Sequence, residues 1–445
     1  MTEKTASLLI KKLNICGHAA FLVGGCVRDK MLNRPICDYD ITTSAKPDEV
    51  INLFEKDYEL VTIGKRHGTI GVIIDNHVYE ITTFRTEDGY DDHRHPNSVS
   101  FIDDVKGDLS RRDFTINALA YDAINDRVID YFDGIGDLNN KIIRAVGDPS
   151  LRFKEDALRI LRGLRFAATL GFNIEKQTLT AMIAEKSGLK DISREKITSE
   201  LTKILCAPFG AKVLYSAKEI LFELIIELKD INGFDQVSLS HDYDVLDHTL
   251  KAIEFCRDKN PVTCWTLLLH DIGKPLCFTV DKNGYGHTKG HMLTSRIIAE
   301  KVLARFSLPK RTVYDILNLI AIHDEDVAKT KYDVKKLICK FGIDFCQNLL
   351  AVKMADMCAH SDYGVKKYLH EKVRLREYLK EIIYNNECCD FSTLAINGDD
   401  LVLLGFKEKS VGEIKSVILD LVMRGDLNNE RDDLLKFAVS QLNNL

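Results

Sequence analysis

Two aspartates, Asp38 and Asp40, stand two residues apart in the stretch DYDIT, which the apolar and β-branched residues around it predict to be a short strand. Side chains two apart on a strand project from the same face, so both carboxylates would point to one side. Two such charges repel unless a cation lies between them. Oxygen ligands of this kind suit Mg²⁺, which proteins often bind through one or two carboxylates and substrate phosphates. The pair predicts magnesium-dependent chemistry on a phosphate compound.

A glycine pair and an arginine precede these aspartates, in the order GG, VRD, DYD. Gly25 lets the backbone approach a phosphate closely, and Arg28 offers a rigid fork of donors to the same group. Asp-x-Asp is common at exposed strand ends, and Gly-Gly is usually only a turn. Together, however, the three pieces resemble the catalytic motif of the polymerase beta nucleotidyltransferase superfamily, in the form used by class II tRNA nucleotidyltransferases and bacterial poly(A) polymerases.

The elements that would position these groups are β-like runs at 58–63, 69–74 and 78–84, which fit a small mixed α/β sheet. Glu80 lies in the last run. Because superfamily members often carry a third acid on a strand beside the Asp-x-Asp strand, the resemblance makes Glu80 the candidate third catalytic carboxylate. A partner for Arg85 and an exposed strand residue are the alternatives. The polar stretch 85–98 predicts a mobile loop beside the site.

A second motif, DLSRRDFTINALA, covers residues 108–120. Its arginines can bind phosphate oxygens, while Asp113 and Asn117 offer groups suited to a ribose hydroxyl. Adjacent charges on loops are frequent, so the triplet alone means little. The stretch is similar to the family's RRDFTINA pattern, and this resemblance implies that Arg112 and Asp113 contact the triphosphate and the sugar of a nucleotide.

A third motif, KEDALRILRGLRFAATLGF, predicts one amphipathic helix over 154–172. Asp156 and Arg159 are three apart and would be neighbours on one face, where a simple salt bridge is the commonest arrangement. In class II tRNA nucleotidyltransferases, the similar EDxxR motif acts as a protein template for the incoming base. An aspartate accepts from the amine of cytosine or adenine, and an arginine donates to ring acceptors, whereas guanine and uracil place a carbonyl against the aspartate. Arg162 and Arg165 would then hold nucleotide or primer phosphates.

From residue 239 onward, histidines and aspartates recur on helical segments, including the stretch HDIGKP. The ordered set resembles an HD-type metal-dependent phosphohydrolase domain, which binds one or two divalent ions and activates water. The resemblance implies a second metal site, for Mn, Ni, Fe or Mg. Similar inserts include working phosphohydrolases and purely structural domains, and both readings stay open. The implied ligands are His248, His270, Asp271, His291, His323 and Asp356.

Length and composition describe an ordinary multidomain protein of 445 residues, with 45% hydrophobic and 29% charged residues. The absence of a spanning apolar run and of a signal-peptide pattern predicts a cytoplasmic protein without membrane contact. The twelve cysteines include no CxxC, which favours reduced thiols over a cysteine-bound zinc. The net charge of −6 is unusual for RNA binding, yet residues 141–176 carry eight basic against four acidic side chains. A solvated helix face is the plainer explanation of that segment.

We therefore predict an α+β fold: a small mixed-sheet nucleotidyltransferase head at 1–145, a helical, RNA-binding neck at 146–235, an HD-type helical domain at 236–362 and a helical tail at 363–445. The resemblance implies template-independent addition of CCA to the tRNA 3′ end from CTP and ATP, with Mg²⁺ as cofactor. A poly(A) polymerase, an enzyme adding only CC or only A, an HD phosphohydrolase with an RNA-binding head, and a nonenzymatic RNA-binding scaffold are the alternatives. The oligomeric state is not predicted.

Overall fold

The computed structural model describes residues 1–90 and 96–442, which divide into two compact units, Met1–Ile226 (unit 1) and Glu227–Leu445 (unit 2). Of the helices in these described stretches, none combines the length and the apolar character needed to span a lipid bilayer. The four predicted domain ranges stay predictions.

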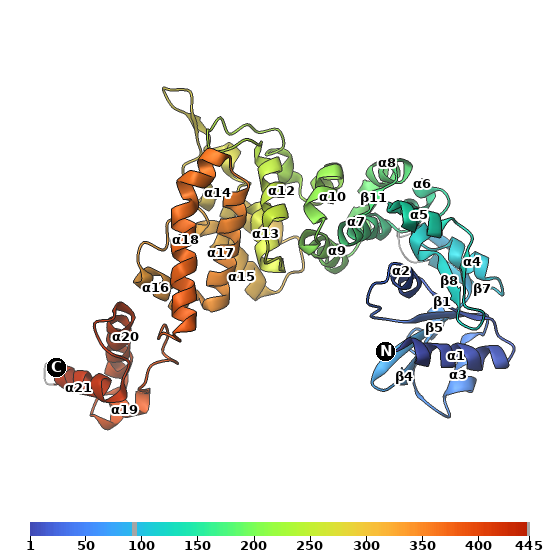
Figure 1. Ribbon diagram of the computed structural model, residues 1–445, viewed down its shortest axis with the longest axis horizontal. Coiled ribbons are helices and arrows are strands. Elements are labelled where there is room, and N and C mark those ends of the chain that lie inside the picture. The colour runs from blue at the N-terminus through green and yellow to red at the C-terminus, as the bar shows by residue number, and fades with distance from the viewer. Residues whose placement is uncertain (91–95, 443–445) are drawn as a thin grey trace. The chain divides into compact units, whose positions relative to one another are not determined.

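Unit 1 is built on a seven-stranded mixed sheet with the strand order β3-β4-β5-β2-β1-β8-β9 (Figure 1). Strands β2 and β5 run parallel, and the other neighbours run antiparallel. The strands are β1 (Ala20–Val23), β2 (Asp40–Thr43), β3 (Glu59–Val61), β4 (Thr69–Ile74), β5 (His77–Thr83), β8 (Leu119–Asp122) and β9 (Arg127–Asp130). Within β5, Tyr79, Ile81 and Thr83 are buried, which is the period of two that the sequence showed. The predicted mixed sheet is confirmed.

Two helices flank the early strands. Helix α1 (Glu3–Ile15) buries Ala6, Leu9, Ile10 and Leu13 on one face, and α3 (Pro47–Phe54) starts at a proline, whose fixed φ suits a first helical turn. The short helix α2 (Gly25–Met31) follows β1 directly. This connection places the glycine pair at the end of a central strand of the sheet.

The stretch predicted as a loop over 85–98 is largely a hairpin. Strands β6 (Arg85–Tyr90) and β7 (Pro96–Phe101) pair antiparallel, with Arg85 opposite Phe101. The loop prediction was wrong here, because a strand ladder is made by main-chain groups and does not require apolar side chains. Residues 91–95 lie outside the described part of the chain.

The rest of unit 1 is mostly helical. Its helices are α4 (Val105–Ser110), α5 (Gly134–Asn140), α6 (Pro149–Glu155), α7 (Leu158–Leu170), α8 (Lys176–Ala184), α9 (Arg194–Cys206), α10 (Gly210–Ser216) and α11 (Lys218–Leu224). The single helix predicted over 154–172 is broken. Asp156 has an extended backbone (φ −142°, ψ 99°), and its Oδ1 accepts from the backbone N–H of Leu158 at 3.0 Å. This side-chain acceptor competes with helix continuation, so the prediction that Asp156 and Arg159 share one helix was wrong.

Unit 2 is a bundle of helices (Figure 1). It contains α12 (Val245–Phe255), α13 (Pro261–Leu269), α14 (His291–Leu303), α15 (Lys310–Ile322), α16 (Lys331–Phe341), α17 (Ile343–Cys358) and α18 (Asp362–Tyr384). A short hairpin, β12 (Thr279–Val280) and β13 (Gly286–His287), separates α13 from α14. The mostly helical character predicted for this half of the chain is confirmed.

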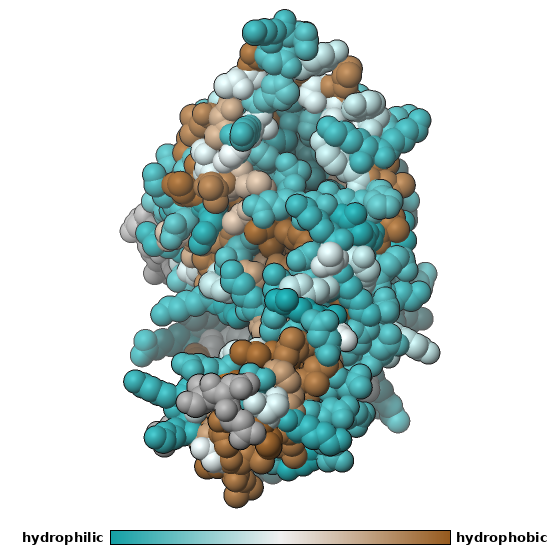
Figure 2. All heavy atoms as spheres, turned by 90° about the vertical axis from the view of Figure 1, so that its left-hand side faces the viewer, coloured by the Kyte–Doolittle hydropathy of each residue, from teal (hydrophilic) through white to brown (hydrophobic). Residues whose placement is uncertain are grey.

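The tail helices α19 (Gly398–Leu403), α20 (Glu408–Arg424) and α21 (Arg431–Leu442) enclose a small core of their own, which includes Leu401, Ile418 and Leu434. Apolar atoms also gather on the surface over these helices, at the lower end of the face shown in Figure 2. Leu403, in α19, is 85% exposed.

Candidate functional site

The turn between β1 and α2 forms part of a polar cavity of about 600 Å³ in unit 1. Gly24 has a φ of +77°, a conformation that favours glycine, and a Cβ there would lie 3.1 Å from Nη1 of Arg112. The conformational requirement therefore falls on Gly24. At the predicted Gly25, an added Cβ would make only an ordinary contact, 3.7 Å from Nη2 of Arg28.

The cavity brings together most of the residues that the sequence singled out in this unit. Those lining it are Gly25, Arg28, Asp40, Arg112, Asp113, Asn117, Asp156, Arg159 and Arg162. Asp38, Glu80 and Arg165 are not among the lining residues. His67 and Phe166 line the cavity without having been predicted. Neither carries a sequence signal of its own, because His67 stands alone and Phe166 falls in the apolar pattern of a helix.

The carboxylates lie at the start of strand β2. Asp40 is the first residue of this strand and stands opposite Glu80 of β5 in the parallel register, as predicted for a neighbouring strand. Asp38 precedes the strand and is exposed, so the prediction that both aspartates lie on one strand was wrong. On one side of β2 the pairing ends because β1 ends at Val23, where the chain turns into α2.

The surroundings of Asp40 disfavour its ionised form. Burial, and then the nearby charge of Glu80, raise the pKa of Asp40, and Asp38 adds to this rise while Arg112 counters it. Neighbouring like charges that raise the pKa of Asp40 favour a bound cation, because a cation stabilises the ionised carboxylate. The donor set thus fits a divalent metal ion with oxygen ligands.

A chain of hydrogen bonds links Arg28 to Arg162 across the cavity. Nη1 of Arg28 donates to Oδ1 of Asn117 at 2.8 Å, and Nδ2 of Asn117 donates to Oδ1 of Asp113 at 3.1 Å. Arg162 then donates to Oδ2 of Asp113 from Nε and Nη2. Burial disfavours the charge on Asp113, but Arg162 and Asn117 outweigh it and lower the pKa of Asp113 to about 2. The network holds both arginines in fixed orientations.

Phe166 lies among three of the arginines. Its buried ring is 5.2 Å from the guanidinium carbon of Arg28, 5.5 Å from that of Arg162 and 4.4 Å from that of Arg165. Nε of Arg165 donates to Oε2 of Glu200 on α9 at 2.6 Å. That bond directs Arg165 toward α9, so its predicted phosphate contact stays a prediction.

Asp108 anchors the two adjacent arginines of the second motif. Its fully buried carboxylate accepts from Arg111 at 2.8 and 3.0 Å and from Arg112 at 3.3 Å. Burial opposes the charge on Asp108, but Arg111 and Arg112 together lower its pKa below the ordinary value. The pair of guanidiniums is therefore held before any nucleotide binds.

Arg159 is fixed by Glu155, the residue before Asp156, and by the carbonyl of Arg111, which accepts from Nη2 of Arg159 at 3.0 Å. Nη1 of Arg159 donates to Oε2 of Glu155 at 3.1 Å, while Nε of Arg159 lies 4.0 Å from Oδ2 of Asp156. Glu155 also accepts from Arg152 at 2.7 Å. The intrahelical Asp-Arg salt bridge considered from the sequence is therefore weak here, and Glu155 is a positioning residue that the prediction missed.

Comparisons with known proteins agree with this geometry. The family described as "Poly A polymerase head domain" matches residues 20–144, and "Probable RNA and SrmB- binding site of polymerase A" matches residues 171–220. The chain is 33% identical to the CCA-adding enzyme of Enterococcus faecalis, over 98% of this chain and 96% of that protein. It belongs to the CCA-adding enzyme family.

Two further comparisons support this membership. The chain is 47% identical to the CCA-adding enzyme of Staphylococcus epidermidis over 239 residues, which span 53% of this chain and 57% of that relative. Among solved structures, the Bacillus stearothermophilus CCA-adding enzyme in complex with CTP superposes with a TM-score of 0.70 at 26% identity, covering 100% of this chain and 99% of that one. The predicted resemblance to class II tRNA nucleotidyltransferases is confirmed.

In this member of the CCA-adding family, unit 2 holds a second polar cavity, of about 430 Å³. The predicted HD-type ligands gather beside it in two groups whose donor atoms lie within 4.8 Å of one another. Asp271 belongs to both groups. The first comprises His248, His270, Asp271 and Asp356, and the second comprises Asp271, His291 and His323.

Backbone carbonyls orient the imidazoles of these groups. Nδ1 of His270 lies 2.8 Å from the carbonyl of Leu267, and His291 and His323 make the same contact to the third residue before each of them, at 2.9 and 2.8 Å. Since a carbonyl only accepts, each Nδ1 donates, which leaves each Nε2 directed at the group as in metal-binding histidines.

The carboxylate oxygens of Asp271 are buried, and Lys274 Nζ forms an ion pair with Oδ2 at 2.6 Å. Burial opposes a charge on His270, but Asp271 and Asp356 raise the pKa of His270 to about 10. A bound divalent ion would supply the positive charge that this proton now provides. The donor set fits one or two such ions.

Two histidines at this cavity, His241 and His360, were not singled out from the sequence. Burial, followed by Lys274, lowers the pKa of His241 to about 2, and burial lowers the pKa of His360 to about 4 despite the nearby Asp356. Their only signal was proximity in the chain to His248 and Asp356.

Proposed function

We propose that this chain adds the sequence CCA to the 3′ end of tRNA, using CTP and ATP and releasing pyrophosphate. The observation that carries this proposal is the 33% identity to a CCA-adding enzyme over nearly the whole of both chains. The polar cavity of unit 1 supplies residues suited to each part of a nucleoside triphosphate. We expect the reaction to take place in the cytoplasm.

Asp38 and Asp40 would hold Mg²⁺. The raised pKa of Asp40 supports this assignment, because a bound cation would stabilise its ionised form. When bound, the metal lowers the pKa of the attacking 3′ hydroxyl and balances charge on the leaving pyrophosphate. Glu80 was the candidate third catalytic carboxylate. Since it stands opposite Asp40 in the sheet and raises the pKa of Asp40, we propose that it acts through its charge on Asp40.

Gly25, Arg28 and Arg112 would bind the triphosphate. The Asp113 carboxylate would accept a hydrogen bond from a ribose hydroxyl, and the Asn117 amide would donate one. The 3′ oxygen of the RNA attacks the α-phosphorus, the bond from this phosphorus to the β-phosphate oxygen breaks, and the hydroxyl proton leaves to solvent. These side chains position the triphosphate for that in-line displacement.

Asp156 and Arg159 would select the base. Asp156 Oδ2 can accept from the exocyclic amine of cytosine or adenine, and Arg159 can donate to the adjacent ring acceptor. Guanine and uracil would leave a buried acceptor facing a carboxylate, which costs on the order of 1 to 3 kcal/mol. Glu155 supports this selection by holding Arg159.

The test is incubation with tRNA ending at the discriminator base, and with tRNA ending in C or CC, while CTP and ATP are supplied separately and together. We expect two C and then one A. Asp40→Asn should abolish incorporation, and Asp75→Asn, at an exposed turn between β4 and β5, should not. Unlimited A addition to unrelated RNA would identify a poly(A) polymerase, and addition of only CC or only A would identify a partial enzyme.

A second candidate function belongs to unit 2. The two candidate ligand groups that share the buried Asp271 support a metal-dependent phosphohydrolase. Its ions would be held by the two groups that share Asp271 and would activate water for attack on a phosphate ester. Release of phosphate from p-nitrophenyl phosphate with Mn²⁺ or Ni²⁺ should disappear in Asp271→Asn and persist in Asp40→Asn, while CCA addition should show the reverse pattern.

A further inference from the structure

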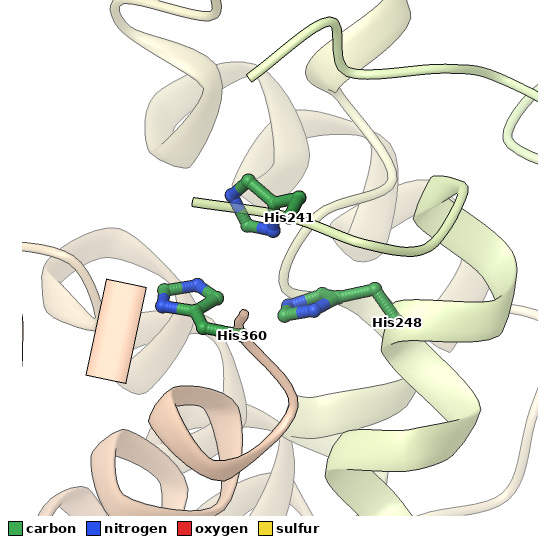
Figure 3. A group of neighbouring side chains, drawn as sticks. All are labelled: His241, His248 and His360. Carbon is green, nitrogen blue, oxygen red and sulfur yellow. The ribbon is translucent and has the colours of Figure 1, made fainter. Parts of the chain in front are cut away.

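Three histidines of unit 2 form a group that has no assigned function as a whole. His241 lies in the loop before α12, His248 lies on α12, and His360 lies in the turn between α17 and α18 (Figure 3). Each offers one ring nitrogen, and the three nitrogens lie within 4.8 Å of one another. The ring centroids are 4.9, 4.4 and 5.2 Å apart, and Figure 3 shows the rings arranged around a common space.

Two of these rings have buried nitrogens without a partner. Nδ1 of His241 and Nδ1 of His360 make no hydrogen bond within the described residues, although both atoms are shielded from solvent. Leaving a buried polar atom unpaired costs on the order of 1 to 3 kcal/mol. Two such atoms on neighbouring rings point to a ligand that the group is built to hold.

The segments that carry His241 and His360 are tied to each other. Ser361 donates from its backbone N–H to the carbonyl of Ser240 at 2.9 Å and from Oγ to the carbonyl of Leu239 at 2.7 Å. A Cβ on Gly364 would lie 2.8 Å from the Ser240 carbonyl oxygen, so glycine permits this close approach. The two rings are therefore positioned by backbone contacts that need no ligand.

We propose that His241, His248 and His360 bind a divalent transition metal ion of the zinc class. Imidazole nitrogens suit zinc, nickel, copper and cobalt, whereas Mg²⁺ and Ca²⁺ require oxygen ligands. The inference rests on the proposal that unit 2 binds divalent ions, and it adds a position beside the two groups that share Asp271.

His248 is the residue that this position shares with the neighbouring group. Its Nδ1 lies 3.3 Å from the carbonyl of Ala359, and its Nε2 lies 2.9 Å from Oδ1 of Asp356. One neutral imidazole ring offers one lone pair, so an ion held by the three histidines takes His248 and leaves His270, Asp271 and Asp356 for the adjacent ion. Each position then keeps three protein ligands and an open coordination site.

The test measures Zn²⁺ bound by the full-length chain in equilibrium dialysis with excess Mg²⁺, which occupies the oxygen ligands of unit 1. The double variant His241→Gln/His360→Gln should bind one equivalent fewer than the wild type. The control is His287→Gln. Its ring lines the same cavity but pairs with Asp281 at 2.9 Å, so this variant should bind as many equivalents as the wild type.

Visible absorption of the Co²⁺-loaded proteins provides a second readout, since the double variant should lose one part of the d–d spectrum and keep the rest. Equal thermal unfolding of the metal-free proteins checks that the variants fold. Equal Zn²⁺ binding by the double variant and the wild type overturns the inference. If the double variant binds as much Zn²⁺ as the wild type but Asp271→Asn binds less, the proposal that unit 2 binds metal stands without the three-histidine site. If Asp271→Asn also binds as much Zn²⁺ as the wild type, both proposals fail.

Discussion

Arg162 donates two hydrogen bonds to a single carboxylate oxygen, Oδ2 of Asp113, from Nε at 2.9 Å and from Nη2 at 2.7 Å. The carboxylate is almost fully buried, so its charge depends on this partner. Because the pKa of Asp113 is lowered to about 2 from an ordinary 3.8, the pair stabilises the folded state above about pH 4, and this contribution is lost as the pH falls from there toward 2. The shift corresponds to about 2 kcal/mol.

Arg162→Ala should therefore raise the pKa of Asp113 and move the acid-induced loss of stability of unit 1 to higher pH. The measurement is urea unfolding followed by far-UV circular dichroism at several pH values between 3 and 7. Arg127→Ala is the control, because the exposed Arg127 lies 3.5 Å from the buried Asp122. Burial opposes the charge on Asp122, but Asn125 and backbone N–H groups, more than Arg127, lower its pKa. Identical pH profiles for Arg162→Ala and the wild type would contradict the coupling.

Glu80 offers a second prediction, about the pH dependence of catalysis. Since burial and then Glu80 raise the pKa of Asp40, protons compete with Mg²⁺ for Asp40 on the acid side of the activity profile. Glu80→Gln should lower the pKa of Asp40 and move the acid limb of kcat/KM for CTP incorporation to lower pH, with activity at alkaline pH reduced less than about tenfold.

Glu59→Gln, at an exposed position of strand β3, is the control for this shift. A loss of about a hundredfold or more at every pH in Glu80→Gln would instead show that Glu80 acts directly as the third catalytic carboxylate. The two outcomes separate an electrostatic role from a ligand role.

Phe166 supports a third prediction, because its ring contacts three guanidinium groups. Phe166→Leu keeps an apolar side chain but removes the aromatic face, at about 0.5 to 1 kcal/mol for each cation–π contact. We expect KM for CTP to rise about three- to tenfold with little change in kcat, since the ring orients Arg28 and Arg162 and touches no reacting atom. Phe255→Leu, an exposed ring 5.9 Å from Lys251 in unit 2, should leave both constants unchanged.

The sequence predicted the chemistry of the unit 1 site better than its geometry. Glycine, arginine and carboxylate residues follow one another in a recognisable order, so residues such as Arg28 and Asp113 could be assigned without coordinates. The break in the helix at Asp156 could not be predicted, because the apolar stripe of 154–172 continues through it. Only a local side-chain hydrogen bond interrupts the helix.

Residues that act through tertiary contacts were also missed. Phe166 reads as one more buried helix position. Arg162 and Arg165 are its neighbours on α7, but Arg28 reaches its ring from α2 only in the fold. His241 and His360 are separated by more than a hundred residues, so their proximity has no local pattern. The six predicted HD-type residues were found because their order along the chain resembles a known family.

Trp265 makes metal binding in unit 2 measurable by itself, because it is the single tryptophan of the chain and is fully buried in α13, five residues before His270 in the sequence. Buried Asp271 and Asp356 cost stability unless a positive charge accompanies them, and an ion that binds only the folded state stabilises it by about 2.7 kcal/mol at a hundred times its Kd. Adding Mn²⁺ to metal-free protein should therefore raise the urea midpoint reported by Trp265 fluorescence, and a chelator should reverse the rise. In Asp271→Asn the rise should vanish, whereas Asp281→Asn, at the exposed rim of the same cavity, should retain it. An equal rise in Asp271→Asn would place the ion elsewhere and remove the physical basis for metal-dependent hydrolysis in unit 2.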